Sequence, residues 1–215
     1  MSKTRQQTVR ILFIGNSFTA RNNLPGLISE LAAARGLNVE TRLLSIGGAS
    51  LRTHWNKGDA LAAIKSGKFD FVVLQEQSTL PIKNAARMRE NVLLFDEAIR
   101  AGGSRTVLYM TWTRKHTPKG QHAITEAYTS IGKEIHGIVV PVGEVWQQFI
   151  RQHDSPALYD KDQSHPTLAG SFLAACVFLT HLLGQSPVGI KISTSGLNAE
   201  SINQLQRAAA ALPKR

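Results

Sequence analysis

The chain has one cysteine, Cys176, among its 215 residues. An internal disulfide is therefore impossible, and the paired cysteines that commonly hold zinc are absent. Cys176 lies within the apolar stretch AGSFLAACVFLTHLL, so we expect a buried structural thiol and not a reactive one. The histidines other than His165 lack the spacing of metal ligands. We therefore predict no bound metal.

Long hydrophobic runs are also missing. No apolar run approaches the roughly 18 residues of a membrane-spanning helix. The apolar run that follows the basic amino terminus is shorter than the roughly 7–15 residues of a signal peptide, and no small-residue cleavage site follows it. The chain as given is thus predicted to be cytoplasmic and to have no membrane partner, unless a leader has been removed from it.

Acidic residues are few relative to basic ones: 15 against 25, which gives a formal charge of +10. Such an excess is compatible with a nucleic-acid partner. The basic residues are scattered, however, and their densest group, Arg114-Lys115-His116 with Lys119, is short. This pattern favours a solvated basic surface over a dedicated nucleic-acid site, with some attraction for anionic substrates or surfaces. The oligomeric state is not predicted.

What the sequence does contain is an alternation of short apolar stretches with helical patterns. Strands are expected at 8–15, 38–48, 69–75, 105–112 and 137–143, helices at 24–36, 83–103, 119–136, 144–153 and 166–184, and helical pieces within 49–67. This order predicts βαβ units and a parallel sheet covered on both faces. No linker or repeat interrupts it, so we predict one α/β domain over 1–215, with a core at about 8–184 and a carboxyl-terminal helix at about 198–211.

In a parallel sheet of this kind the functional crevice lies beyond the carboxyl ends of the strands. Small or polar residues follow every predicted strand, in the segments GNSFT, SIGGAS, LQEQS, TWTRKH and PVGEVW. A need for turn residues alone would not explain why groups suited to catalysis follow several strands. We therefore predict that the functional site lies at the carboxyl edge of the sheet.

A later polar loop, DKDQSHP, places Asp162 three residues before His165 and just ahead of a helix. The carboxylate can turn back to accept a hydrogen bond from imidazole Nδ1, which leaves Nε2 free to take a proton from a hydroxyl. Ser17, in the turn after the first strand, is the natural hydroxyl. Each residue considered alone could also have a purely structural role. Ser17 could be a turn or cap residue, and His165 could cap the helix that follows it.

Taken together, these blocks resemble the SGNH hydrolases of the wider GDSL esterase/lipase superfamily. Gly15-Asn16-Ser17 is similar to the first block of the family, Gly48 to the second and Asp162-x-x-His165 to the last. The resemblance implies a flavodoxin-like fold of three αβα layers. It also implies that Ser17 is the nucleophile, His165 the general base and Asp162 its partner.

The chain departs from the family pattern in two places. Asn16 replaces the usual aspartate of the first block, and Gln75-Glu76-Gln77-Ser78 replaces the usual Gly-x-Asn-Asp of the third. The register puts Gln77 at the asparagine position, where its amide can also donate a hydrogen bond. Because side chains alternate along a strand, Gln75 and Gln77 are expected to face the crevice, with Glu76 pointing toward a neighbouring loop or solvent. A register shifted by two would make Gln75 the donor.

The implied activity is hydrolysis of small acyl esters through an acyl-enzyme intermediate, with O-acetyl groups on carbohydrates as one candidate substrate. Backbone N–H groups of Ser17 and Gly48 and the amide of Gln77 would bind the oxyanion, and no metal or organic cofactor is needed. Asn16, Gln75 and Trp112 are candidate substrate-binding residues, although Trp112, after the fourth strand, is equally well explained as a core residue.

Two other classes of function are compatible with parts of this sequence. An inactive module of the same fold, binding a sugar or an anionic polymer, is the alternative. A nucleotide-binding protein is disfavoured because neither G-x-x-x-x-G-K-[ST] nor G-x-G-x-x-G occurs.

Overall fold

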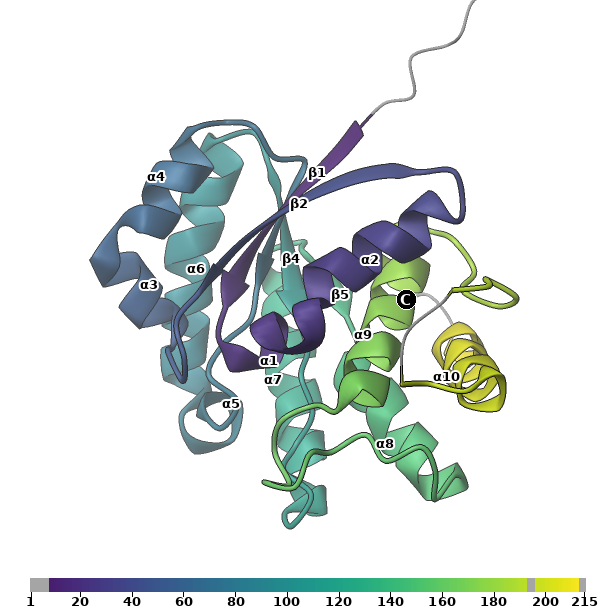
Figure 1. Ribbon diagram of the computed structural model, residues 1–215. Coiled ribbons are helices and arrows are strands. Elements are labelled where there is room, and N and C mark those ends of the chain that lie inside the picture. Colours follow the sequence, from purple (N-terminus) through teal and green to yellow (C-terminus); the bar gives the residue numbers. More distant parts are fainter. Residues whose placement is uncertain (1–7, 193–195, 213–215) are drawn as a thin grey trace, which may run out of the picture.

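The computed structural model describes residues 8–192 and 196–212. Its centre is a parallel five-stranded sheet with the strand order β2-β1-β3-β4-β5 (Figure 1). The strands are β1 (Thr8–Gly15), β2 (Asn38–Ser45), β3 (Phe71–Leu74), β4 (Arg105–Tyr109) and β5 (Ile138–Val140). This is the flavodoxin-like order of a doubly wound sheet. The predicted fold class is confirmed.

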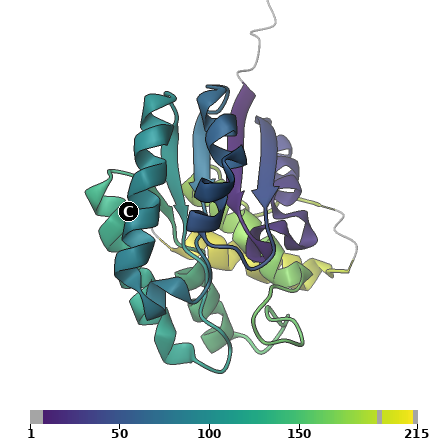
Figure 2. The same cartoon turned by 90° about the vertical axis from the view of Figure 1, so that its left-hand side faces the viewer.

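Helices cover both faces of the sheet, as Figures 1 and 2 show. One layer contains α2 (Leu24–Ala33), α8 (Val142–Gln152), α9 (Leu168–His181) and α10 (Ala199–Ala211). The other contains α3 (Leu51–Lys57), α4 (Asp59–Lys65), α6 (Ala85–Ala101) and α7 (Gln121–Glu134). Short elements complete the chain: α1 (Ser17–Ala20), α5 (Leu80–Lys83) and the 3-10 turns η1 (Arg21–Asn23) and η2 (Pro118–Gly120).

The two hydrophobic cores follow from the alternation of side chains along the strands. In β1, Ile11 and Phe13 face the layer of α2 and α9, whereas Leu12 and Ile14 face the layer of α4 and α6. All four side chains are fully buried. A strand buried on both sides must be apolar throughout, which explains the unbroken run ILFI.

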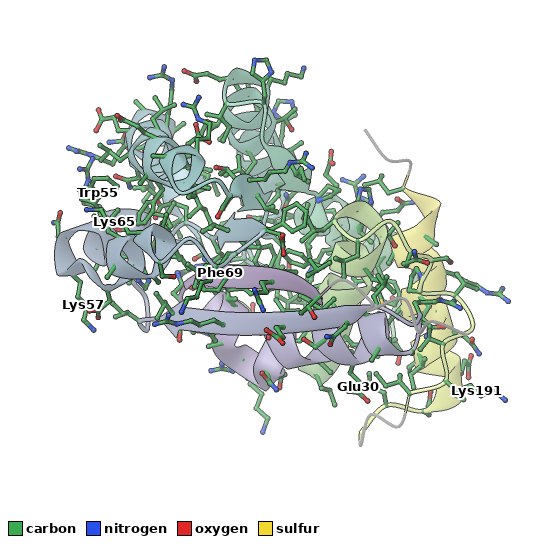
Figure 3. The ribbon with its side chains drawn as sticks, turned by 90° about the horizontal axis from the view of Figure 1, so that it is seen from above. Glu30, Trp55, Lys57, Lys65, Phe69 and Lys191 are labelled. Carbon is green, nitrogen blue, oxygen red and sulfur yellow. The ribbon has the colours of Figure 1, made fainter. Side chains whose placement is uncertain are left out.

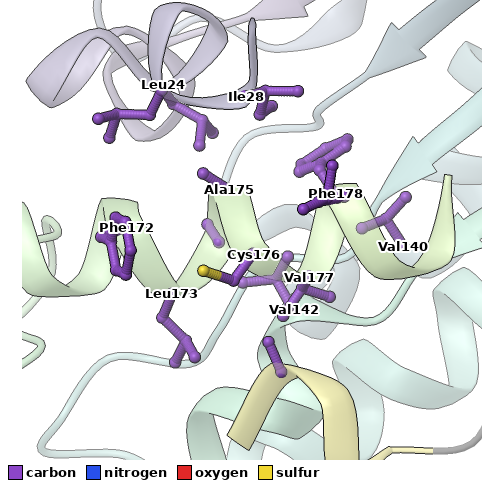
Figure 4. Close-up of a cluster of buried hydrophobic side chains, with 14 of the residues drawn as sticks. Leu24, Ile28, Val140, Val142, Phe172, Leu173, Ala175, Cys176, Val177 and Phe178 are labelled. Carbon is purple, nitrogen blue, oxygen red and sulfur yellow. The ribbon is translucent and has the colours of Figure 1, made fainter. Parts of the chain in front are cut away.

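Helix α9 belongs to the first of these cores, and its residues from Ala169 to Thr180 are all buried. Figure 4 shows Leu24 and Ile28 of α2 pointing toward it, with Cys176 among its inward side chains. Cys176 is fully buried and unpaired, and burial raises the pKa of its thiol. The prediction of a structural thiol is confirmed.

The second strand ends three residues earlier than predicted. The N–H of Ile46 donates to the carbonyl of Gly15, and a turn then follows in which the N–H of Ala49 donates to Ile46. Gly48 lies in this turn with a φ of 67°, a left-handed conformation that favours glycine. The backbone thus leaves the sheet here, and the turn that contains Gly48 lies beside the end of β1.

Charged side chains are distributed around the molecule. In Figure 3, Lys57 and Lys65 lie at one side and Lys191 at the opposite side. Within the part of the chain that the structure describes, every helix is too short or too polar to cross a membrane.

Candidate active site

The site begins where β1 ends. Asn16 has an extended backbone and caps α1, its side-chain oxygen accepting a hydrogen bond from the N–H of Phe18, and Ser17 is the first residue of that helix. Gly15 is required by close packing, because a Cβ at this position would lie 2.7 Å from side-chain oxygens of Gln75 and Thr19. The chain therefore turns sharply from a buried strand into a helix, and Ser17 lies half-buried at the sheet edge.

Three residues predicted from separate parts of the sequence come together at this point. Ser17 Oγ lies 2.8 Å from His165 Nε2, across 148 residues of chain. On the other side of the ring, His165 Nδ1 is hydrogen-bonded to Asp162 Oδ2. A hydroxyl, an imidazole and a carboxylate in this order are the components of a Ser-His-Asp triad.

The loop that carries Asp162 and His165 is fixed by its own hydrogen bonds. Asp162 Oδ1 accepts from the backbone N–H groups of Ser164, at 3.0 Å, and His165, at 2.9 Å. Gln163 has a φ of 58°, which allows the tight reversal between the two functional residues. The hydrogen bond from His165, with those from the backbone, holds the pKa of Asp162 well below its usual range. The carboxylate thus stays ionised in neutral and mildly acidic solution.

Aromatic rings lie directly beneath the histidine. Phe18 packs against His165 with ring centroids 5.2 Å apart and stacks on Trp112 at 5.1 Å. Trp112 stacks in turn on Trp146 and donates from Nε1 to the carbonyl of Ser164 at 3.0 Å. Trp112 is only 1% exposed and supports the histidine loop from below, so of the two roles that the sequence left open it has that of a core residue.

Asn16 and Gln75, the other two candidates for substrate binding, have buried side chains that bond to the protein itself. Asn16 is 2% exposed, and its Nδ2 donates to the carbonyl of Ala49 at 2.9 Å, so its side chain ties the serine turn to the loop of Gly48. Gln75 is 1% exposed. Its Oε1 accepts from the N–H of Asn16 at 2.9 Å and from Thr19 Oγ1 at 3.0 Å. Both residues hold the serine turn and leave no surface for a ligand.

The predicted oxyanion donors lie in three neighbouring loops. Among the described residues, no hydrogen bond engages the backbone N–H of Ser17 or of Gly48. Gln77 is half-buried, and its Oε1 accepts from Thr79 N, Thr79 Oγ1 and Leu80 N at 2.9–3.0 Å. Within the described part of the chain, these hydrogen bonds all use Oε1, and none engages Gln77 Nε2. Each of the three groups can thus donate to a ligand.

Sequence reasoning gave two buried polar residues too little weight. His54 is buried, its Nε2 lies 2.7 Å from the carbonyl oxygen of Gly15, and burial lowers its pKa. Glu76 was expected to point toward a loop or solvent, and it is 1% exposed within a hydrogen-bond network. The three-residue spacing of Leu51 and His54 on one helix face was a signal that His54 points inward.

Within residues 8–192 and 196–212, histidine, cysteine, aspartate and glutamate form no cluster of three or more that could hold a metal ion.

Several solved structures are similar to this chain. A protein from Slackia heliotrinireducens assigned to the SGNH hydrolases is 30% identical, with a TM-score of 0.70, over 80% of this chain and 97% of its own. A DUF4886 family protein from Bacteroides uniformis is 20% identical, with a TM-score of 0.79, over 95% and 94%. The acetylxylan esterase Axe2 from Geobacillus stearothermophilus is 18% identical, with a TM-score of 0.62, over 80% and 92%. No protein-family model and no curated protein matches the sequence.

Proposed function

This chain belongs to the SGNH hydrolase family, and from this we propose that it is a serine esterase acting through Ser17, His165 and Asp162. The observation that carries the proposal is the 2.8 Å contact between Ser17 Oγ and His165 Nε2, with Asp162 on the other ring nitrogen. A serine hydroxyl is a weak nucleophile until an adjacent base takes its proton. This arrangement supplies that base.

In the first half-reaction, Ser17 Oγ attacks the ester carbonyl carbon while His165 Nε2 accepts the hydroxyl proton. The imidazolium that forms is stabilised by the ionised Asp162. The tetrahedral intermediate collapses when the bond to the alcohol oxygen breaks, and His165 returns the proton to that oxygen. The products of this step are the free alcohol and an acyl group on Ser17.

In the second half-reaction, water attacks the acyl-enzyme and His165 accepts its proton. Collapse of the second tetrahedral intermediate releases the carboxylic acid and restores the Ser17 hydroxyl. In both halves the negative charge on the carbonyl oxygen would be stabilised by the N–H groups of Ser17 and Gly48 and the amide of Gln77. Loss of one such donor typically costs about 2.7–4 kcal/mol of transition-state stabilisation.

The substrate is proposed to carry a short acyl group, with O-acetylated carbohydrates as the first candidate. A fatty acyl chain needs an extended apolar surface, and the exposed large hydrophobic side chains among the described residues are Ile82 and Val188. The loops after β1 and β2 are also short, with only a few residues before α1 and α3. One protein that shares this fold is an acetylxylan esterase, so the fold is compatible with such a substrate.

A panel of p-nitrophenyl esters from acetyl to dodecanoyl, assayed beside acetylated sugars, tests this preference. We expect kcat/KM to be highest for acetyl or propionyl and to fall by about tenfold or more by octanoyl, since added methylenes gain little binding energy without an extended apolar surface to cover them. A steady rise in kcat/KM toward dodecanoyl would contradict the short-chain proposal and leave the esterase proposal standing.

Labelling by a fluorophosphonate distinguishes the esterase from an inactive binding module of the same fold. An active serine should form a covalent adduct that mass spectrometry locates on Ser17. Wild-type protein that neither reacts with the probe nor hydrolyses any ester of the panel would favour the binding module.

We expect Asp162→Asn to keep more activity than a loss of the nucleophile. In serine hydrolases, removing the acid costs about 10⁴-fold in kcat, whereas removing the serine costs about 10⁶-fold. Ser17 and His165 still meet in this variant, but the amide favours the wrong imidazole tautomer. Steady-state kinetics on p-nitrophenyl acetate would measure the difference, with Asp154→Asn as an exposed control. Wild-type kcat in Asp162→Asn would remove the carboxylate from the mechanism.

A further inference from the structure

The buried carboxylate of Glu76 joins two of the loops that carry the proposed oxyanion donors. Its Oε1 accepts from the N–H of Gln77 at 2.7 Å and from the N–H of Leu51 at 3.0 Å. Leu51 begins α3, three residues after Gly48. One oxygen atom thus fixes the backbone of the Gln77 loop against the backbone that follows Gly48.

The second oxygen anchors this junction to the helix layer. Glu76 Oε2 accepts from Asn91 Nδ2 at 2.8 Å, and Asn91 Oδ1 accepts from Arg52 Nε at 3.0 Å. Asn91 belongs to α6, and Figure 1 shows α6 beside α3. All three groups bonded to the Glu76 carboxylate are donors, as an ionised carboxylate requires. Arg52 adds a positive charge on the far side of Asn91.

A buried carboxylate is costly, and burial raises the pKa of Glu76 against the opposing effect of these hydrogen bonds and of Arg52. If the position served only to fill space, an apolar side chain of similar volume would do so without that cost. The carboxylate does what an apolar group cannot: it binds two backbone N–H groups from different loops to the same atom.

We propose that Glu76 is a positioning residue, which sets the distance between the Gln77 amide and the Gly48 N–H across the oxyanion site. The inference rests on the proposed esterase function. Oxyanion donors act only within a narrow range of distances from the developing charge. A displacement of about 1 Å at a reacting centre can cost about 10²-fold in rate, so a loosened junction lowers kcat without touching the triad.

The test exchanges the partners across the Glu76–Asn91 hydrogen bond. Glu76→Gln keeps an oxygen for Gln77 and Leu51 but places an amide group opposite Asn91 Nδ2, so donor faces donor. We expect kcat on p-nitrophenyl acetate to fall about 10- to 100-fold with KM within about twofold of wild type. Asn91→Asp alone brings two carboxylates together and should lower both kcat and the melting temperature.

The double variant Glu76→Gln/Asn91→Asp restores the pairing, because the introduced amide can donate to the introduced carboxylate, which still accepts from Arg52. We expect its kcat to return to within about threefold of wild type. Glu97→Gln is the matched control, because Glu97 is an exposed carboxylate on α6, the helix that carries Asn91. This variant should leave kcat unchanged. All rates are measured well below each melting temperature, on protein shown by circular dichroism to be folded.

The possible outcomes separate positioning from mere stability. If folded Glu76→Gln keeps the wild-type kcat and only melts earlier, the positioning role is wrong. If Glu76→Gln does not fold, a folded double variant that still has a low kcat also overturns it. Wild-type protein without esterase activity would overturn the proposed function and this inference together, whereas an active wild type with an unaffected Glu76→Gln overturns the inference alone.

Discussion

Ser17→Ala and His165→Ala should each lower kcat/KM for p-nitrophenyl acetate by about 10⁶-fold and leave the protein folded. The hydroxyl and the imidazole act as one unit across their 2.8 Å contact, so removing either removes proton transfer and attack together. Both side chains are partly exposed at the sheet edge, and neither fills a core position. Circular dichroism and thermal unfolding should therefore show little change.

The double variant provides a sharper test of the shared role. Ser17→Ala/His165→Ala should be no slower than either single variant, because residues of one catalytic unit are not additive. Ser66→Ala and His122→Ala are matched controls: both residues are exposed, and the side chain of His122 is 89% accessible. Ester hydrolysis at the wild-type rate by Ser17→Ala would show that another residue is the nucleophile.

The fold followed from the sequence where one physical rule dominated. The run Ile11 to Ile14 is apolar throughout because helices cover both faces of β1, and that pattern alone predicts a central strand. Gly58, with a φ of 86°, separates α3 from α4 as the predicted helical pieces required. The short helices α1 and α5 were not predicted, since about one turn of helix depends on its caps and its packing and leaves no periodic pattern.

Parts of the candidate site were predictable for a different reason. Ser17 follows the end of β1, and His165 lies in a recognisable loop ahead of α9. The order of strands and helices then brings the two residues together. The hydrogen bonds of Asn16 and Gln75 could not be predicted, because residue type does not reveal which backbone groups a polar side chain will bond to. Gln75 Oε1, for example, is taken by an N–H and a hydroxyl from the serine turn, two contacts fixed only by tertiary packing.

The rule that side chains alternate in direction along a strand was less useful for the residues after β3. It predicted that Gln75 and Gln77 share a direction and that Glu76 faces elsewhere. Because β3 ends at Leu74, the rule no longer governs these residues, and each side chain follows its own hydrogen bonds. Glu76 does contact a neighbouring segment, the start of α3, as expected. Its side chain is buried there, however, and does not reach solvent.

The largest effect expected outside the triad is at Gln77. Gln77→Ala should lower kcat by about 10²- to 10³-fold with little change in KM, because an oxyanion donor acts mainly in the transition state. The same change also removes the Oε1 atom that accepts from Thr79 and Leu80, so alanine alone does not separate a lost donor from a loosened loop.

Gln77→Glu separates these two effects. A carboxylate of the same length keeps an oxygen for Thr79 and Leu80, but it replaces the NH₂ donor with a second acceptor that repels the oxyanion. We therefore expect kcat to fall at least as far as in Gln77→Ala, with a melting temperature closer to wild type. Gln75→Ala is the comparison: its buried side chain holds the serine turn, so its loss should lower the melting temperature as well as kcat. If Gln77→Glu kept the wild-type kcat, Gln77 would be a loop cap only, and the N–H groups of Ser17 and Gly48 would suffice for the oxyanion.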